Sequence, residues 1–274
     1  LPTRNSQGDI ASAYQLSHGD TRHVLLIPGT MEECFTFATR ALDLAEHLQT
    51  LVFLMSDLDL GMNKWISDPF APPLEDAIPR GKVLSATEVE KVSSFNRYED
   101  VDGDGIPYRT IPGTDSSKAP YFTRGTGHDK SAVYSENSDV WKDNMDRLTH
   151  KYETARTMVP EPIIESDADA DIAIIAFGSS DPAIQEARHL LMSREDINSN
   201  YLRLRALPLT DSVGEYIKDN KIVYIVEQNR DGQVASILKS EYPEYATHIR
   251  SILHYNGMPI DAESIVAQLL AQRA

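Results

Sequence analysis

The sequence predicts an α/β protein with parallel strands, and three observations support this prediction. Residues 23–30, 31–48 and 51–55 form an apolar run, an amphipathic stretch and a second apolar run. A strand, a helix and a strand in this order normally place the two strands side by side and parallel. Beyond residue 169, four strand-like runs alternate with four helix-like stretches, which predicts a small doubly wound sheet covered on both faces. Hydrophobic residues at 41 % and charged residues at 25 % are typical of a globular protein.

The first strand and helix have clear ends. The apolar run from His23 ends at Pro28-Gly29, a dipeptide that favours a turn. Thr30 and Glu33 have the spacing of a capping box, which predicts that a helix begins at residue 31. Apolar side chains then recur at three- and four-residue spacing, and these are Phe35, Ala38, Leu42, Ala45 and Leu48.

The middle of the chain is different in character. Residues 57–138 are rich in Pro, Gly, Asp and Ser and show little periodicity. Loops of this length in compact proteins are usually functional or contact a partner. Helical periodicity returns at residues 140–158, ends at Pro160, and is followed at residues 165–169 by a stretch typical of an interdomain linker.

The last third of the chain alternates regularly between strand and helix. The expected strands are 172–177, 201–204, 222–226 and 249–255, and the expected helices are 182–192, 213–219, 233–239 and 262–270. At 274 residues the chain is long enough for two compact domains. We therefore expect domains at 1–138 and 169–274, joined by a connecting helix and linker at 139–168.

Composition excludes several classes of function. The net charge of −16 would repel a phosphate backbone, so nucleic acid is not expected as a partner. The single cysteine, Cys34, excludes an internal disulfide and an iron–sulfur cluster held by this chain alone. No run approaches the roughly 20 apolar residues of a membrane span, and no signal peptide is present, so we expect a cytoplasmic protein. Leu1 is not an initiator methionine, and we expect the chain to be part of a longer one.

An acidic loop at residues 100–105 has two interpretations. Asp100, Asp102 and Asp104 alternate as in the opening of a calcium loop, and Gly105 stands at the sixth position. The twelfth position is Ile111, which cannot chelate, so a tight turn without metal is favoured over a Mg²⁺ or Ca²⁺ site completed by a distant ligand. The triplet 103–105 also matches the start of a thiamine-diphosphate motif, but it follows a polar stretch and lacks a suitably placed asparagine.

Two further segments are candidates for ligand contacts. Arg124, Thr126 and His128 combine donors, glycine-rich backbone and a titratable imidazole, which suits an anionic substrate or a diphosphate. An ordinary polar loop explains the same residues equally well. Residues 227–233 follow a predicted strand directly, where open α/β sheets place ligands, although many such crossings are only packing turns.

Five phrases spread over nearly the whole chain are distinctive together. They are Leu1-Pro2-Thr3, SDLDLGMN at 56–63, DVDGDG at 100–105, TRGTGHD at 123–129 and EQNRDGQ at 227–233. In order and spacing they resemble the α subunits of 2-oxoacid:ferredoxin oxidoreductases, especially of the 2-oxoglutarate type. The resemblance implies the remainder of a pyrimidine-type thiamine-enzyme domain, followed by a doubly wound domain similar to the transketolase C-terminal domain.

The resemblance also implies a reaction and its partners. In that family the β subunit supplies the thiamine-diphosphate and Mg²⁺ motif and the cysteines of a [4Fe–4S] cluster. The implied reaction is oxidative decarboxylation of a 2-oxoacid with coenzyme A, with electrons passed to ferredoxin. Carried onto this sequence, the resemblance implies that Thr3, Arg4, Arg124, Thr126 and His128 contact substrate.

Two other classes of protein remain open. A non-catalytic module that only holds a partner subunit would need no catalytic set of its own, and the sequence contains no recognisable one. A free-standing transketolase-like or dinucleotide-binding enzyme would need its own diphosphate motif or glycine-rich turn, and neither is present. A neighbouring reading frame with a Gly-Asp-Gly motif and four cysteines would favour the oxidoreductase.

Overall fold

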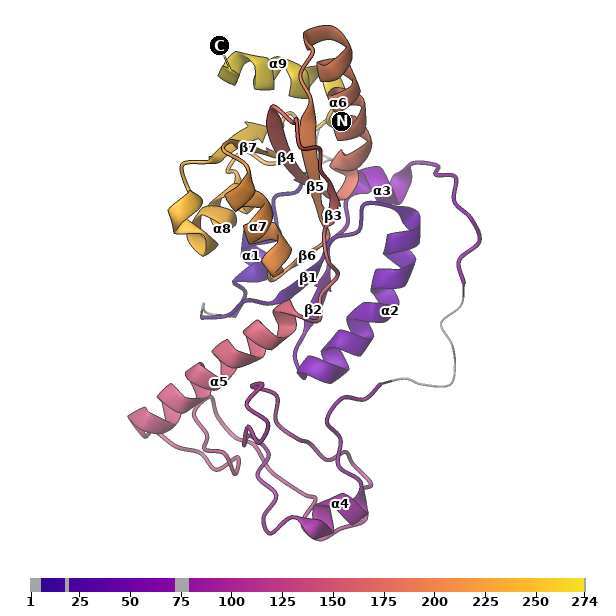
Figure 1. The fold of residues 1–274 in the computed structure, drawn as a ribbon. Coiled ribbons are helices and arrows are strands. Elements are labelled where there is room, and N and C mark those ends of the chain that lie inside the picture. Colours follow the sequence, from indigo (N-terminus) through magenta and orange to yellow (C-terminus); the bar gives the residue numbers. More distant parts are fainter. Residues whose placement is uncertain (1–5, 18–19, 72–78, 274) are drawn as a thin grey trace. The chain divides into compact units, whose positions relative to one another are not determined.

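The computed structural model describes residues 6–17, 20–71 and 79–273 (Figure 1). The chain forms two compact units, each assembled from segments that are distant in the sequence. Unit 1 consists of residues 1–41, 53–72 and 159–274, and unit 2 consists of residues 42–52 and 73–158. N-terminal and C-terminal residues share one hydrophobic core in unit 1. The expected domains at 1–138 and 169–274, with the connecting segment 139–168, stay a prediction.

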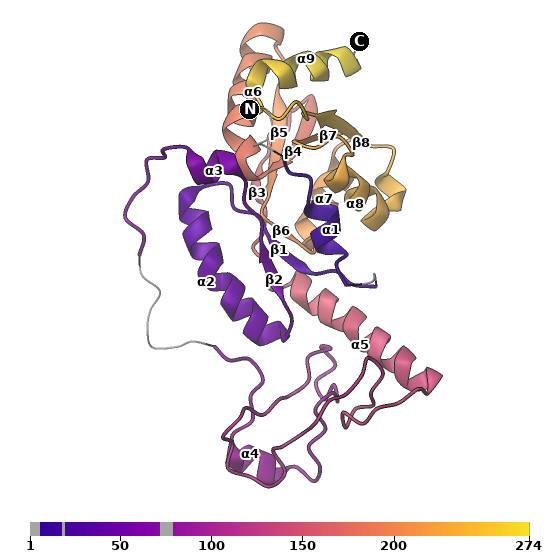
Figure 2. The same ribbon diagram turned by 180° about the vertical axis from the view of Figure 1, so that it is seen from behind.

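Unit 1 contains a five-stranded sheet in the order β3-β5-β4-β7-β8 (Figures 1 and 2). Its strands are β3 Ile163–Glu165, β4 Ile172–Phe177, β5 Ser199–Leu204, β7 Val223–Glu227 and β8 Ile249–Leu253. β4 pairs in parallel with β5 and β7, and β7 with β8, which confirms the four predicted strands. The sequence does not predict β3, which runs antiparallel to β5 inside the expected linker. All three of its residues are exposed, so no buried apolar run marks it.

Alternate side chains of the central strand enter two cores on opposite faces of the sheet. Ala173, Ile175 and Phe177 belong to one core, and Ile172 and Ile174 belong to the other. The first is covered by α1 Ile10–Tyr14, α7 Asp211–Asp219 and α8 Gln233–Glu241, and the second by α6 Asp181–Glu195 and α9 Ala262–Arg273. Short 3₁₀ turns are η1 Gly178–Ser180 and η2 Pro243–Tyr245. The predicted doubly wound sheet, with helices on both faces, is therefore observed (Figures 1 and 2).

A second, three-stranded sheet has the order β2-β1-β6. Its strands and the neighbouring helices are β1 Val24–Leu26, α2 Met31–Leu48, β2 Val52–Leu54, α3 Leu58–Met62 and β6 Ala206–Leu207. The helix predicted at 31–48 is confirmed with both of its ends. β6 follows β5 after one residue and pairs antiparallel with β1, so Leu25 lies opposite Leu207. A two-residue strand has no periodicity of its own, and the sequence does not predict it.

Unit 2 consists mainly of loops, together with the C-terminal part of α2 and the helices α4 Ala86–Lys91 and α5 Ser138–Arg156. Ser85 and Glu88 form a capping box at the start of α4, and the Asn137 side chain caps α5. The loop at residues 100–105 packs on the backbone of α5 at Gly105, where an added Cβ would overlap Lys151 N. Across the ranges that the structure describes, no helix is long and apolar enough to cross a membrane.

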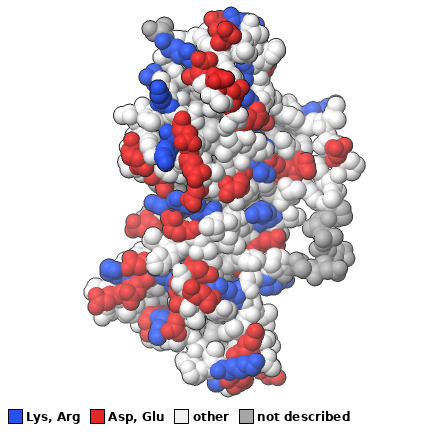
Figure 3. Space-filling model, in the orientation of Figure 1, with Lys and Arg blue, Asp and Glu red and all other residues white. Residues whose placement is uncertain are grey.

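Charged side chains are interspersed on the molecular face that Figure 3 shows. Acidic and basic residues alternate there over short distances, and among the described residues no broad basic patch gathers on this face. On this face the acidic side chains are therefore not gathered in one region.

Gly103 and Gly105 provide a matched test of the packing of the acidic loop on α5. Both have φ of +77°, but nothing lies within 4 Å of a Cβ added at Gly103. We expect Gly103→Ala to lower the free energy of unfolding by about 1–2 kcal/mol, because the left-handed conformation disfavours a side chain. Gly105→Ala should cost about 1–3 kcal/mol more, because the loop must move away from the helix. Equal losses in urea denaturation would contradict this packing.

Candidate functional site

The strand order places a topological switch point between β4 and β7. The chain leaves β4 toward β5 on one side and leaves β7 toward β8 on the other. Open α/β sheets bind ligands in the crevice at the carboxyl ends of two such strands. In this chain the residues that follow the two strands are Gly178–Ser180 and Gln228–Asn229.

The side chain of Gln7 fills this crevice. Its Nε2 donates to the carbonyl oxygen of Phe177 at 3.2 Å and to Ser180 Oγ at 3.3 Å. Its Oε1 accepts from the backbone N–H of Gln228 at 3.0 Å, and its own backbone N–H donates to the Gln228 carbonyl at 2.8 Å. Gln7 is 8 % exposed, so its side chain is buried at the carboxyl ends of β4 and β7, where other doubly wound proteins hold a ligand.

Hydroxyl and carboxylate groups extend this buried network. Ser179 Oγ donates to Asp57 Oδ2 at 2.5 Å, and the Gln228 Nε2 donates to the hydroxyls of Ser179 and Ser180. Asp57 Oδ1 accepts the first free N–H groups of α3, from Asp59 and Leu60. Gln228 Oε1 is buried without a hydrogen-bond partner. The network orients the ends of three elements.

Glu227, at the end of β7, accepts hydrogen bonds from the first turn of α8. Its carboxylate accepts the backbone N–H groups of Val234 at 2.8 Å and Ala235 at 2.9 Å, together with the Asn229 amide at 2.9 Å. Burial raises the pKa of Glu227, although these donors act in the opposite direction. The phrase 227–233, predicted from its position after a strand, is thus part of the crevice, and its acid serves a structural role.

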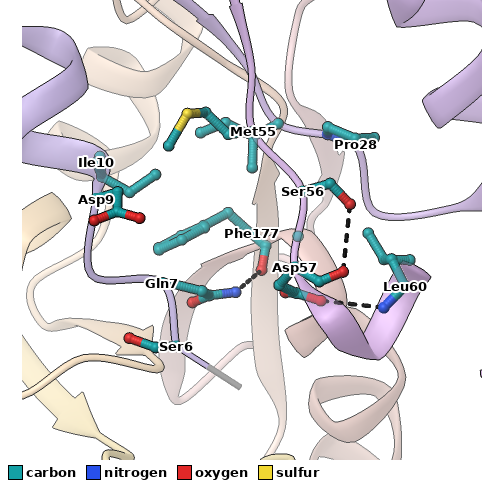
Figure 4. A pocket seen from close by; sticks show the side chains of 12 residues that line it. Ser6, Gln7, Asp9, Ile10, Pro28, Met55, Ser56, Asp57, Leu60 and Phe177 are labelled. Carbon is teal, nitrogen blue, oxygen red and sulfur yellow. Dashed lines mark hydrogen bonds between the residues drawn. The ribbon is translucent and has the colours of Figure 1, made fainter. Parts of the chain in front are cut away.

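A small cavity of about 40 Å³ adjoins the network (Figure 4). It is lined by Ser6, Gln7, Asp9, Ile10, Ile27, Pro28, Met55, Ser56, Asp57, Leu60, Phe177 and Gly178. A cavity of this volume holds a few waters rather than an organic substrate.

A larger open pocket of about 640 Å³ lies at the start of α2. It is lined by Gly29–Glu32, Phe35–Thr36, residues 65–71 and Asp181–Pro182. The Phe35 and Phe70 rings stack with centroids 5.1 Å apart, and Trp65 adds a third aromatic wall. A volume of this size accommodates a flat organic group. The sequence did not predict this pocket.

Glu33 forms a buried ion pair beside this pocket. Its carboxylate accepts two hydrogen bonds from the Arg203 guanidinium, at 2.6 and 2.9 Å, and one from the Gly29 N–H at 2.8 Å. Arg205 Nε lies 2.8 Å from the same carboxylate. Burial alone would raise the pKa of Glu33, but the bonds from Arg203 and Gly29 and the two positive charges hold it below its usual value. A Cβ at Gly29 would overlap the Arg203 guanidinium, so this position requires glycine.

The ion pair changes one feature that the sequence predicts. The Glu33 N–H donates to Thr30 Oγ1 at 3.1 Å, which is half of the predicted capping box. The Glu33 carboxylate turns to Gly29 and Arg203 instead of the Thr30 N–H. Arg203 and Arg205 lie about 170 positions away, the first inside the predicted strand 201–204 and the second directly after it, and nothing in their local sequence marks them as partners.

The residues predicted to contact substrate fall into two groups. Thr3 and Arg4 lie outside the described residues. Arg124, Thr126 and His128 lie in unit 2, where Arg124 and Thr126 are exposed and His128 is half-buried. The His128 ring stacks on Tyr98 with centroids 3.9 Å apart. Their contact with substrate stays a prediction.

The acidic loop forms the tight turn that the sequence favours. Asp100 accepts the N–H groups of Gly103 at 2.9 Å and Gly105 at 2.8 Å. Lys82 Nζ lies 2.7 Å from both Asp102 and Asp104, and it holds the pKa of Asp102 below its usual value. No three His, Cys, Asp or Glu side chains among the described residues are grouped so that they could hold a metal ion. Lys82 supplies the positive charge, and a metal at Asp100, Asp102 and Asp104 stays a prediction.

Comparison with known structures identifies the class of fold. The structure of 2-oxoglutarate:ferredoxin oxidoreductase from Magnetococcus marinus superposes with a TM-score of 0.84 and 21 % identity. The match covers 100 % of this chain and 46 % of that one. No protein-family model matches the chain.

Curated relatives all point to one kind of protein. The α subunit of 2-oxoacid:ferredoxin oxidoreductase 2 from Aeropyrum pernix is 28 % identical over 269 residues, which is 95 % of this chain and 40 % of the relative. The 2-oxoglutarate synthase subunit KorA from Methanothermobacter thermautotrophicus is 29 % identical over 83 % of this chain and 58 % of its own length. The chain is thus similar in sequence to α subunits of 2-oxoacid:ferredoxin oxidoreductases, and it spans about 40 % of the length of the first of these relatives.

Glu33→Gln tests whether the buried ion pair holds unit 1 together. The variant leaves the Arg203 and Arg205 charges without their carboxylate, and breaking a buried pair in this way costs about 3–5 kcal/mol. Glu32→Gln makes the same charge change one residue earlier, at an exposed position, and should cost less than about 0.5 kcal/mol. Urea denaturation of both variants measures the difference. Similar losses would show that Glu33 contributes no more than a surface charge.

The same pair predicts a pH dependence. Because the pKa of Glu33 is lower in the folded protein, its stabilising contribution is present above the unfolded value of 4.5 and is lost as the pH falls through the folded value. The difference in unfolding free energy between the wild type and Glu33→Gln should therefore shrink as the pH falls below 4.5. A difference that grows on acidification would contradict the lowered pKa.

Proposed function

We propose that this chain acts as part of the α subunit of a thiamine-diphosphate-dependent 2-oxoacid:ferredoxin oxidoreductase. The observation that carries the proposal is the similarity to the Aeropyrum α subunit along 95 % of this chain. The reaction is oxidative decarboxylation of a 2-oxoacid with coenzyme A, and ferredoxin accepts the electrons. The enzyme is proposed to work in the cytoplasm with a β subunit.

The proposed substrate is 2-oxoglutarate. The names of the Methanothermobacter relative and of the Magnetococcus structure support this choice, since both refer to 2-oxoglutarate. The finer assignment of the fold is a proposal as well. Residues 1–138 would be the remainder of a pyrimidine-type domain, and residues 169–274 would resemble the transketolase C-terminal domain, in keeping with the doubly wound sheet.

The described residues of this chain do not fit a diphosphate-bound metal or an iron–sulfur cluster. Asp104 accepts hydrogen bonds from Lys82 and from the Ile106 N–H, and the Asn137 carbonyl caps α5, so neither is free to bind a metal. The chain has one cysteine, Cys34. We therefore assign thiamine diphosphate, Mg²⁺ and [4Fe–4S] to the β subunit.

In this proposal the chain binds and orients the substrate. Ser6, two positions after Arg4 in the sequence, lines the small cavity. The neighbouring Gln7 is held in place by its hydrogen bonds to Phe177 and Gln228. The hydroxyl of Thr3 would donate to a substrate carboxylate or carbonyl oxygen, and Arg4 would add a positive charge. The aromatic pocket beside Phe35 would hold a flat group of the substrate or cofactor.

Turnover by the assembled protein tests the proposal. We expect the complete α protein, purified with its β subunit, to reduce viologen in a coenzyme A-dependent reaction, with 2-oxoglutarate preferred over pyruvate and branched 2-oxoacids. The complete α protein alone should be inactive. A stable complex that turns over none of these acids would instead support the alternative of a non-catalytic assembly module.

Thr3→Val isolates the proposed substrate contact. The substitution keeps the shape and removes the hydroxyl, and losing a hydrogen bond to a charged group costs about 1.5–3 kcal/mol, or roughly ten- to a hundredfold in kcat/KM. Thr149→Val, at an exposed position of α5, should leave kcat/KM unchanged. Wild-type kcat/KM of Thr3→Val for every 2-oxoacid would show that Thr3 is structural.

A further inference from the structure

Three basic side chains of unit 2 lie close together without an acidic partner. They are Arg97, Arg147 and Lys151, and each is within electrostatic reach of the other two. In the part of the chain that the structure describes, none of the three forms an ion pair with a carboxylate. Asp100 is the acid that influences Arg147, and its carboxylate already accepts the N–H groups of Gly103 and Gly105. The cluster thus has an excess of positive charge.

Lys151 is the most deeply placed member of this cluster. It is 7 % exposed, and its ammonium donates no hydrogen bond to another described residue. Burial, together with the charges of Arg147 and Arg97, lowers the pKa of Lys151 to about 8. Buried charges in proteins are normally paired, because an unpaired one is costly to remove from water. An unpaired buried ammonium within electrostatic reach of two guanidinium groups therefore favours the binding of an anion.

Both guanidinium groups are fixed by hydrogen bonds, and both have further N–H donors without a partner. Arg97 donates to Gln49 Oε1 at 2.7 Å, and Arg147 donates to the Gly105 carbonyl at 3.1 Å. The buried Nε and Nη1 atoms of Arg97 and the Nε of Arg147 have no hydrogen-bond partner. The donors of this cluster are thus preorganised and unsatisfied.

An aromatic wall connects the cluster to the loop that the sequence singled out. The Tyr98 ring lies 4.9 Å from the Arg97 guanidinium and 5.8 Å from that of Arg147. His128 stacks on the same ring, and the Tyr98 hydroxyl lies 3.1 Å from Thr123 Oγ1. The segment 123–129, which contains Arg124 and Thr126, therefore contacts the Tyr98 ring on which the Arg97 and Arg147 guanidinium groups lie.

We infer that Arg97, Arg147 and Lys151 form a binding site for a phosphate group, bordered by the loop at 123–129. A phosphate carries a charge near −2 and at least three acceptor oxygens, and it matches two guanidinium groups and an ammonium better than a carboxylate does. The phosphate is either free inorganic phosphate or a monoester on an organic group. The inference does not depend on the proposed function.

Calorimetry with the complete protein that contains this chain tests the site. We expect inorganic phosphate and phenyl phosphate to bind and to raise the melting temperature, because a ligand that binds only the folded state stabilises it. Comparable affinity for both would assign the site to phosphate monoesters, and binding of inorganic phosphate alone would assign it to the free ion. Absence of both heat and stabilisation at about 10 mM of either probe would overturn the inference.

Lys151→Met and Lys142→Met provide matched variants on α5. Lys142 is exposed and pairs with Asp146, so its loss should leave phosphate affinity unchanged. Lys151→Met removes a buried unpaired charge, so it should keep or raise the melting temperature while weakening phosphate binding at least about tenfold. Unchanged phosphate affinity in Lys151→Met would exclude the site.

Proton uptake by the wild-type protein is a second measurement, which does not depend on the folding of a variant. Near pH 8 part of the Lys151 population is neutral, and a bound phosphate should return the proton. The binding enthalpy should then vary with the ionisation enthalpy of the buffer. An enthalpy that is the same in all buffers would show that phosphate does not bind beside Lys151.

Discussion

The buried carboxylate of Glu33 is the interaction on which the arrangement of unit 1 depends. It stands in the first turn of α2 and binds Arg203 at the end of β5 and Arg205 just before β6, so one side chain ties the two sheets together. The buried Arg203 guanidinium requires an acid, and the buried acid requires its donors. β6 pairs with β1 directly beyond Arg205, and the glycine at position 29 leaves room for the Arg203 guanidinium.

The closed crevice at the switch point bears on where chemistry takes place. In other doubly wound sheets this crevice is open to a ligand, whereas here Gln7 satisfies the exposed groups of Phe177, Ser180 and Gln228. The remaining cavity is small enough to hold a few waters rather than an organic substrate. Gln7 therefore closes the crevice and links Phe177, Ser180 and Gln228.

Unit 2 contains one acidic loop whose charges are compensated and one basic cluster whose charges are not. The acidic loop is neutralised internally, since Lys82 faces Asp102 and Asp104 and the glycine N–H groups face Asp100. The basic cluster around Lys151 has no such compensation among the described residues. The acidic loop is therefore neutralised without a ligand. The basic cluster has the positive charge and the free N–H donors that a phosphate would use.

The sequence by itself determined the class of fold, the four parallel strands, their helices and the ends of α2, because these depend on local periodicity, turns and caps. It also predicted the similarity to α subunits of 2-oxoacid:ferredoxin oxidoreductases, through phrases whose order spans the chain. Only the tertiary structure decided the pairing of β6 with β1, the exposed edge strand β3, the division into units, the partners of Gln7 and Glu33, and the placement of Lys151 near Arg97 and Arg147. These features join residues about 50 to 220 positions apart, or rest on two- and three-residue strands. Such contacts follow from packing and desolvation in the folded chain, which no local pattern of residues encodes.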